Sequence, residues 1–193
     1  METTKTMAKE PKPNLRLPKL SQADVSFASV WLQPEEIAND QLHMSSGILQ
    51  RTLTGLKKRS AGWRESGAIW AGDLEEAQST VREVFFYHDL CDDLGRALSL
   101  ELSEAAKFSL YRELAARGLK LVGMIHTHPK DWVELSYIDQ ANQLCSRIGF
   151  WSLVVPYYAK REWDINTAGV HIRISQGWHR FSPSEAAERI IIK

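Results

Sequence analysis

Two patterns of apolar residues alternate along the chain: short continuous runs and longer segments with helical spacing. A short continuous apolar run is typical of a strand that is buried on both faces. Strands are therefore predicted over 25–32, 66–72, 81–88, 119–125 and 150–158, and a final hairpin over 168–175 and 177–181. Apolar positions three or four residues apart predict helices over 34–58, 103–118, 136–148 and 184–190. Because strands and helices interleave, the expected class is α/β (α+β), with a mixed sheet.

Local signals mark the ends of these helices. Pro34 suits a first helical turn, and Gly118 suits the left-handed residue that follows a helix. Segment 89–100, with two aspartates and a glycine, is expected to be a loop. Cys145 is expected on the apolar side of helix 136–148. The apolar side of helix 103–118 is expected to consist of Phe108, Leu110, Tyr111 and Leu114.

The composition is that of an ordinary globular domain, since 44% of the residues are hydrophobic and 25% are charged. A length of 193 residues fits one domain with an extension. Residues 1–22 combine three prolines with basic side chains and few apolar groups. We therefore expect a flexible N-terminal arm over 1–22 and one domain over 23–193. The arm is interpreted as a solvated tail, with docking to an acidic partner as the alternative.

Charge and cysteine content exclude several classes of protein. The 24 basic and 24 acidic residues balance, whereas a dedicated nucleic-acid-binding protein usually carries a basic excess. Cys91 and Cys145 are too few for a disulfide scaffold or a four-cysteine zinc site. The apolar stretches are far shorter than the roughly 20 residues of a membrane helix, and no signal peptide is recognised. We therefore expect a cytoplasmic protein that binds neither nucleic acid nor membrane.

The end of the strand predicted over 119–125 carries the residue types of a metal site. His126 and His128 are two residues apart, so both imidazoles leave the same face of the strand. Pro129 ends the strand, and Asp139 falls in the first turn of the next predicted helix, within reach of the strand end. Two imidazoles and one carboxylate form the ligand set of an open catalytic zinc site, in which water takes the fourth position.

Such a site also needs a base that is not a metal ligand. Three nearby carboxylates are candidates: Glu65, Asp131 and Glu134. Glu65 is favoured because it immediately precedes the strand predicted over 66–72, which could lie beside the histidine strand. Gly67 and Gly72 in that strand permit a close approach of the backbones.

The spacing of these residues resembles a family signature. The chain reads His126-Thr127-His128-Pro129, six further residues, Ser136, two further residues and Asp139. This pattern resembles the JAMM signature of the JAB/MPN metalloprotease family, which also has an upstream glutamate. Residues 65–72 resemble the upstream strand of that family, with Ala68 in place of a glycine and Trp70 in place of an aliphatic residue. The resemblance covers roughly residues 24–190, and its C-terminal part is similar to prokaryotic JAB proteins.

The resemblance implies a JAB/MPN-like (cytidine-deaminase-like) fold, a curved mixed β-sheet flanked by helices. It implies that His126, His128 and Asp139 bind Zn²⁺. Glu65 would then hold the attacking water and pass its proton to the leaving amine, and Ser136 would donate a hydrogen bond to the oxyanion. The implied reaction is hydrolysis of the amide bond after the C-terminal glycine of a ubiquitin-like protein. A bacterial ubiquitin-like conjugation pathway, including antiviral defence, is the setting that the family suggests.

Other interpretations apply to the same residues. Ser136 and Asp139 also match a helix capping box, and the upstream histidines favour metal binding over capping. Trp63 and Trp132 are candidates for the walls of a groove for an extended peptide, against simple packing. Asp131 and Glu134 could instead face a basic partner. The remaining histidines are interpreted as structural or surface residues: His43, His88, His171 and His179.

Two further function classes compete with the peptidase. One is a non-catalytic MPN scaffold, which usually lacks ligands that this chain retains. The other is a JAMM hydrolase that acts on cell-wall peptides or on sulfur-carrier conjugates. The motif specifies the reaction and leaves the acyl donor open.

Overall fold

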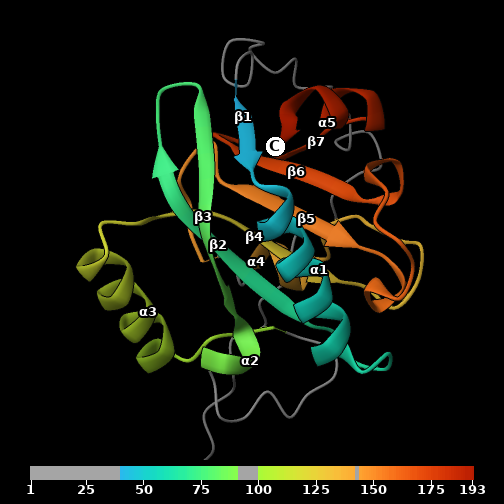
Figure 1. The fold of residues 1–193 in the computed structure, drawn as a ribbon, viewed down its shortest axis with the longest axis horizontal. Helices are drawn as coiled ribbons and strands as arrows, with labels where there is room; N and C mark the ends of the chain where they lie inside the picture. Colours follow the sequence, from blue (N-terminus) through green and yellow to red (C-terminus); the bar gives the residue numbers. More distant parts are fainter. Residues whose placement is uncertain (1–39, 91–99, 142–143) are drawn as a thin grey trace, which may run out of the picture. The chain divides into compact units, whose positions relative to one another are not determined.

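Within residues 40–90, 100–141 and 144–193, which the computed structural model describes, eight strands form one mixed sheet (Figure 1). In chain order they are β1 (Gln41–Met44), β2 (Gly67–Leu74), β3 (Gln78–Phe86), β4 (Lys120–Thr127), β5 (Trp151–Val155), β6 (Gly169–Ile174), β7 (Gly177–Arg180) and β8 (Ile190–Ile192). Their order across the sheet is β7-β6-β5-β4-β2-β3-β1-β8. The predicted class, a mixed sheet flanked by helices, is confirmed.

Strand β4 lies in the middle of the sheet and carries His126 near its end, with His128 directly after it. It pairs antiparallel with β2 and parallel with β5. Parallel neighbours need a long crossover connection, which residues 128–150 provide between β4 and β5. Strands β5, β6 and β7 are antiparallel to one another in turn, and β1 is parallel to both β3 and β8. The topology therefore places the crossover next to the end of β4.

The helices flank this sheet and carry clear end signals. They are α1 (Ser46–Ser60), α2 (Tyr87–Leu90), α3 (Glu104–Ala116), α4 (Tyr137–Ala141) and α5 (Pro183–Arg189), with 3₁₀ turns η2 (Tyr157–Ala159) and η3 (Ile165–Thr167). Ser45 caps α1, Ser103 caps α3, and Ser182 with Glu185 forms a capping box on α5. Among the described residues, every helix is too short or too polar to cross a bilayer.

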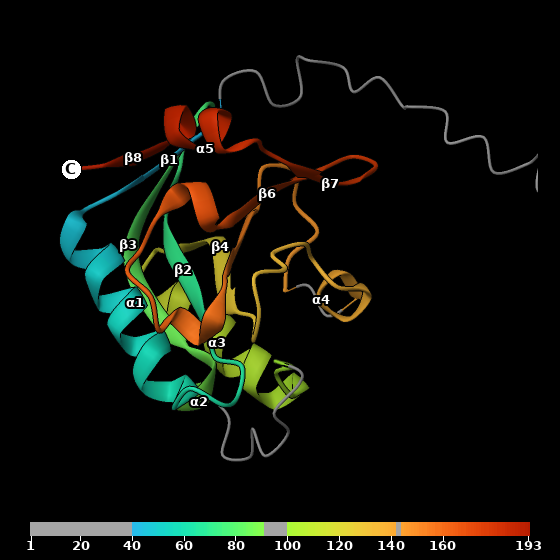
Figure 2. The ribbon, with the colours of Figure 1, turned by 90° about the vertical axis from the view of Figure 1, so that its right-hand side faces the viewer.

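Alternate residues of β2 face two different layers. Trp70 is fully buried toward α1, where its indole Nε1 donates to Thr52 Oγ1 at 3.2 Å. Its neighbours Ile69 and Ala71 point to the other face and join the core beneath α3. Figure 2 shows α1 on one side of the sheet and α4 on the other. The core on the α3 side consists of Ile69, Ala71, Tyr87, Leu102, Ala106, Leu110, Leu114, Leu121, Met124, Leu144 and Phe150.

Several predicted elements match the structure closely. The strands predicted over 66–72, 81–88 and 119–125, the hairpin over 168–181 and the helices over 103–118 and 184–190 are all present with shifted ends. Gly118 adopts a positive φ of 67° after α3, as expected for a left-handed cap. The predicted arm 1–22, the predicted strand 25–32 and Cys91 lie outside the described residues.

The helix predicted over 34–58 is wrong at its start, because residues 41–44 form strand β1. In β1 the side chains of Leu42 and Met44 are buried, and those of the residues beside them are less buried. This alternation arises because β1 lies between β3 and β8 in the sheet. The helix begins only after Ser45, whose Oγ accepts from the backbone N–H of Ile48 at 3.2 Å. Pairing with strands distant in sequence therefore outweighs the helical spacing of the apolar residues.

The helix predicted over 136–148 is also wrong over residues 144–148, which are not helical. The guanidinium of Arg147 donates to the backbone carbonyls of Leu121 and Ile148 at 3.4 and 2.9 Å. Gly149 then turns the chain into β5 with a φ of 81°. Cys145 packs against the core from this irregular segment and not from a helix.

Smaller differences occur elsewhere in the sheet and in α3. Phe108 and Tyr111 are 68% and 44% exposed, so the expected apolar side of α3 is wrong at these two residues and right at Leu110 and Leu114. Strand β5 ends at Val155 because Pro156 follows, and residues 157–159 form a turn in place of the predicted strand. Strand β8 was not predicted, because three isoleucines after a helix give too short a pattern.

Gly72 lies at a bulge of β2, and a Cβ atom there would be 1.9 Å from the backbone oxygen of Thr80 on β3. We expect Gly72→Ala to lower the free energy of unfolding by about 1–3 kcal/mol, because the backbones must separate. Gly47 is the matched control, since a Cβ there meets only Ser45 Oγ at 3.8 Å. Gly47→Ala should be neutral or stabilise by up to about 1 kcal/mol in urea denaturation. Equal effects of the two substitutions would contradict this packing.

Candidate metal centre

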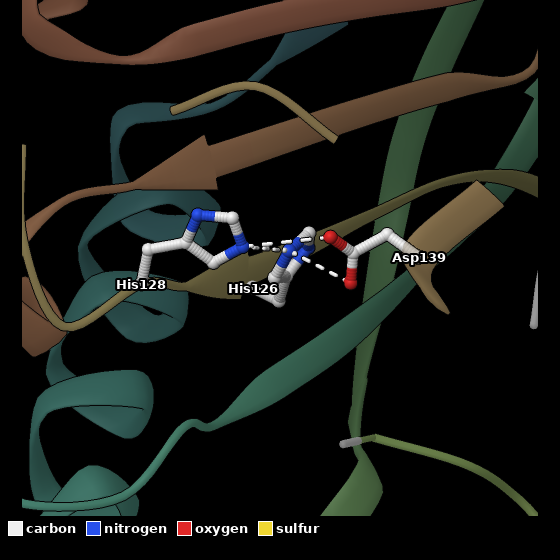
Figure 3. Close-up of side chains that lie close together, drawn as sticks. All are labelled: His126, His128 and Asp139. Carbon is white, nitrogen blue, oxygen red and sulfur yellow. Dashed lines mark hydrogen bonds and ion pairs between the residues drawn. The ribbon is translucent and has the colours of Figure 1, made fainter. Parts of the chain in front are cut away.

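His126 and His128 bring their imidazoles together at the end of β4 (Figure 3). Their Nε2 atoms are 3.1 Å apart, and both residues are buried. The alternation of the strand explains this arrangement, because Thr127 between them faces the opposite side. There the hydroxyl of Thr127 accepts a hydrogen bond from the backbone N–H of Ser66 at 3.0 Å. The prediction that both imidazoles leave one face is confirmed.

Asp139 reaches both imidazoles from the first turn of α4 (Figure 3). Its Oδ1 lies 3.4 Å from His126 Nε2, and its Oδ2 lies 3.5 Å from His128 Nε2. The same carboxylate accepts from the backbone N–H of Ser136 at 2.7 Å, and the N–H of Asp139 donates to Ser136 Oγ at 3.1 Å. The capping box is therefore present, and the same carboxylate also approaches both imidazoles.

These three side chains fit a metal ion. Their nitrogen and oxygen atoms all lie within 4.8 Å of one another. A tetrahedral zinc ion with ligand distances of about 2.0–2.1 Å separates its ligand atoms by about 3.3 Å. The observed separations of 3.1, 3.4 and 3.5 Å are close to that value. Two imidazoles with one carboxylate leave the fourth position open, which is typical of a catalytic site.

A backbone contact fixes the orientation of the His128 ring. Its Nδ1 is 2.9 Å from the carbonyl oxygen of Trp132, and a carbonyl can only accept, so Nδ1 carries the proton. Nε2 is then left with its lone pair toward the site, as a metal ligand requires. The indole of Trp132 stacks on the same imidazole, with ring centroids 5.0 Å apart and planes 11° apart.

The surroundings of Asp139 stabilise the ionised form of its carboxylate. Burial alone would raise the pKa of Asp139, but hydrogen bonds with His126, His128 and Ser136 hold that pKa well below its usual range. Burial opposes the charged form of His128, yet Asp139 and the carbonyl of Trp132 outweigh it and raise the pKa of this imidazole. The carboxylate is thus available in its ionised form to a metal ion.

A strained turn supports the backbone of His128 from behind. Tyr157, Tyr158 and Ala159 have φ values of 56, 56 and 55°, and each left-handed residue of this kind costs about 1–2 kcal/mol. The N–H of Tyr158 donates to the carbonyl of His128 at 2.8 Å, and Ser60 Oγ donates to the carbonyl of Tyr158 at 3.0 Å. The turn therefore connects the backbone of His128 to the end of α1 through hydrogen bonds.

Glu65 lies beside this group because of the register of β2 and β4. Gly67 pairs with His126, and the pairing continues as the N–H of Thr127 donates to the carbonyl of Ser66 at 2.9 Å. The same register, continued by one residue, brings Glu65 next to His128, and the two side chains interact electrostatically. Burial raises the pKa of Glu65 to about 7, with His128 opposing this shift and the Asp139 charge adding to it.

The other two candidate carboxylates differ in their surroundings. Glu134 contacts Arg180 of β7, which donates from Nη1 to Glu134 Oε1. Glu134 therefore has a basic group of its own chain beside it, and its contact with a basic partner stays a prediction. Asp131 is exposed, and its role stays a prediction.

The predicted groove walls, Trp63 and Trp132, are 62% and 51% exposed. Trp132 stacks on His128, whereas the ring of Trp63 lies 5.3 Å below the guanidinium of Arg64. A peptide groove between the two indoles stays a prediction.

His171, which the sequence analysis interprets as a structural or surface residue, is buried near the site. It is 2% exposed, and burial lowers its pKa to about 4, with smaller effects from the charges of His126, His128 and Asp139. Its spacing from the ligands in sequence gives no signal, because β6 joins the site only through its pairing with β5. The carbonyl of Trp132 was missed for a different reason, since backbone groups leave no trace in a motif.

No protein-family model matches the sequence. A solution structure of a protein from Desulfitobacterium hafniense is similar to this chain, with 13% identity, a TM-score of 0.57 and coverage of 79% of this chain and 92% of that chain. A protein from Salinibacter ruber is similar with 15% identity, a TM-score of 0.52 and coverage of 78% and 91%. At these identities the likeness shows a shared fold alone.

A JAB1/MPN domain protein from Archaeoglobus fulgidus is 20% identical and covers 78% of this chain and 97% of that chain. Its TM-score of 0.43 is too low to support an argument.

We expect the purified protein to bind about one zinc ion per chain and His128→Ala and Asp139→Asn to lose it, as measured by elemental analysis. Zinc at about 100 times its Kd should stabilise the wild type by about 2.7 kcal/mol and raise its Tm, because the ion binds only the folded state. Neither variant should respond. His43→Ala on β1 is the control and should behave like the wild type. Zinc retained by both variants would contradict the proposed ligand set.

Proposed function

We propose that the protein is a zinc-dependent JAMM metallopeptidase that cleaves the amide bond after the C-terminal glycine of a ubiquitin-like protein. The observation that carries the proposal is the convergence of His126, His128 and Asp139, with Glu65 next to His128. The resemblance to the JAB/MPN family supplies the substrate class. A bacterial ubiquitin-like conjugation pathway, including antiviral defence, is part of the same proposal.

The residues of the site are assigned separate tasks in this reaction. When bound, zinc would act as a Lewis acid on the scissile carbonyl and activate the attacking water at neutral pH. The carboxylate of Glu65 accepts the proton of that water and delivers it to the nitrogen of the leaving amine. Its partly buried position and raised pKa fit a group that must take up and release a proton.

Ser136 is proposed to stabilise the oxyanion. Its Oγ accepts a hydrogen bond from the N–H of Asp139, and a hydroxyl carries one proton in addition to its lone pairs. That proton is available to the oxygen on which negative charge develops. The capping interaction thus orients the hydroxyl as well as the carboxylate of Asp139.

Glu65 is favoured as the base over Glu134 for an electrostatic reason. Arg180 pairs with the carboxylate of Glu134, and a nearby guanidinium disfavours protonation of a carboxylate. Glu65 has no comparable partner among the ion pairs of the described residues, and its pKa is raised rather than lowered.

We expect Glu65→Gln to lower kcat by about 10²–10⁴-fold, because the base is lost, while zinc content stays near one per chain. The assay measures release of a reporter fused after the C-terminal glycine of a ubiquitin-like protein. Glu76→Gln, a substitution at an exposed residue of the β2–β3 turn, is the matched control and should retain full activity.

The same assay separates the competing functions. Cell-wall peptides and sulfur-carrier conjugates are assayed side by side with the ubiquitin-like fusion. If the zinc-bound wild type cleaves only one of these alternatives, the proposed substrate class is wrong and the proposed reaction stands. Wild type that binds zinc and cleaves none of these substrates would favour the non-catalytic MPN scaffold. Equal rates for the wild type and Glu65→Gln would remove Glu65 from the mechanism.

A further inference from the structure

Glu134 lies in the loop between β4 and α4, midway between two backbone groups that orient the metal ligands. The carbonyl of Trp132, two residues earlier, accepts the hydrogen bond from His128 Nδ1 at 2.9 Å. The N–H of Ser136, two residues later, donates to Asp139 Oδ2 at 2.7 Å. The position of this one loop therefore affects two of the three ligand side chains.

The side chain of Glu134 ties the loop to the neighbouring strands. Arg180 on β7 donates to its Oε1, and His171 Nε2 on β6 lies 3.7 Å from its Oε2. The imidazole of His171 is itself fixed, because its side chain is only 3% exposed and its Nδ1 is 3.3 Å from the carbonyl of Ser152. Glu134 is thus bound to a cation and lies beside a rigid, buried ring.

Packing holds the loop from the residues on either side of Glu134. Val133 and Leu135 are buried against Val154 of β5. Gly169 on β6 leaves room for the loop backbone, because a Cβ there would lie 2.0 Å from the carbonyl oxygen of Val133. The apolar contacts press the loop onto the sheet, and the polar contacts of Glu134 resist its sliding along the strands.

We propose that Glu134 and Arg180 form a clamp that positions the loop for metal binding, with the buried ring of His171 packed beside the Glu134 carboxylate. Both are positioning residues, since the ligand set consists of other side chains. Partners that orient metal ligands typically change metal affinity by about 10–100-fold when they are removed. The inference rests on the zinc site of the proposed function and does not depend on peptidase activity.

The alternative is that the apolar contacts alone hold the loop and that the Glu134–Arg180 ion pair contributes nothing. The side chains of Glu134 and Arg180 are 45% and 43% exposed, and exposed ion pairs contribute little to stability in general. If the apolar contacts alone held the loop, loss of this ion pair would leave the loop and the metal affinity unchanged.

The test uses Glu134→Ala, Arg180→Ala, the double variant and the milder Glu134→Gln. Asp73→Ala is the matched control, because it breaks an exposed ion pair with Arg82 on strands β2 and β3. Zinc Kd is measured by competition with a chelator. Hydrogen exchange of the peptide covering 129–136 is measured in the metal-free protein, and Tm reports folding.

We expect both single alanine variants to bind zinc about ten-fold more weakly or worse, and the double variant to be no worse than either single variant. Exchange in the 129–136 peptide should be several-fold faster in the metal-free variants, at an unchanged Tm. Glu134→Gln should show a smaller effect in the same direction. The control should match the wild type in every measurement.

Two results would overturn the clamp. One is a zinc Kd and a loop exchange rate in Glu134→Ala and Glu134→Gln that equal those of the wild type. The other is an equal change in Asp73→Ala, which would indicate a nonspecific effect of surface charge. Wild type that binds no zinc would overturn the proposed function, and exchange in the metal-free protein would still decide whether Glu134 holds the loop.

Discussion

The carboxylate of Asp139 is held at the same time by the backbone of its own helix turn and by two imidazoles at the end of β4, His126 on the strand and His128 just after it. This shared carboxylate joins two parts of the chain that the crossover from β4 to β5 would otherwise leave separate. Because the N–H of Ser136 and the imidazoles stabilise the same ionised group, α4 begins where the metal site requires it. The geometry of the site thus depends on one capping interaction.

The remaining elements fix the other ligands around that carboxylate. Pairing of β2 with β4 sets the register that brings Glu65 next to His128, and the strained turn after β5 supports the backbone of His128. The loop over β5 and β6 supplies the Trp132 carbonyl that selects the His128 tautomer. Most of these contacts involve backbone groups, which explains why a short motif can produce a well-defined site on a sheet assembled from distant segments.

Local patterns predicted the parts of the site that local rules govern. The placement of His126 and His128 follows from strand alternation, and the position of Asp139 follows from a helix start. Pairings between distant segments were not predictable, because strand β1 forms only between β3 and β8. The contact of Arg147 with the distant carbonyl of Leu121 has no local signal either, and His171 reaches the site only through β6. Glu65 needed the resemblance as well, since its approach depends on the register of β2 against β4.

The central claim is that one metal ion binds between His126, His128 and Asp139. The most direct measurement is anomalous diffraction at the zinc edge from crystals of the zinc-loaded protein. The account predicts one strong peak about 2.0–2.1 Å from both Nε2 atoms and from the carboxylate. A zinc peak elsewhere in the chain, or no peak between these three side chains at full zinc loading, would contradict it.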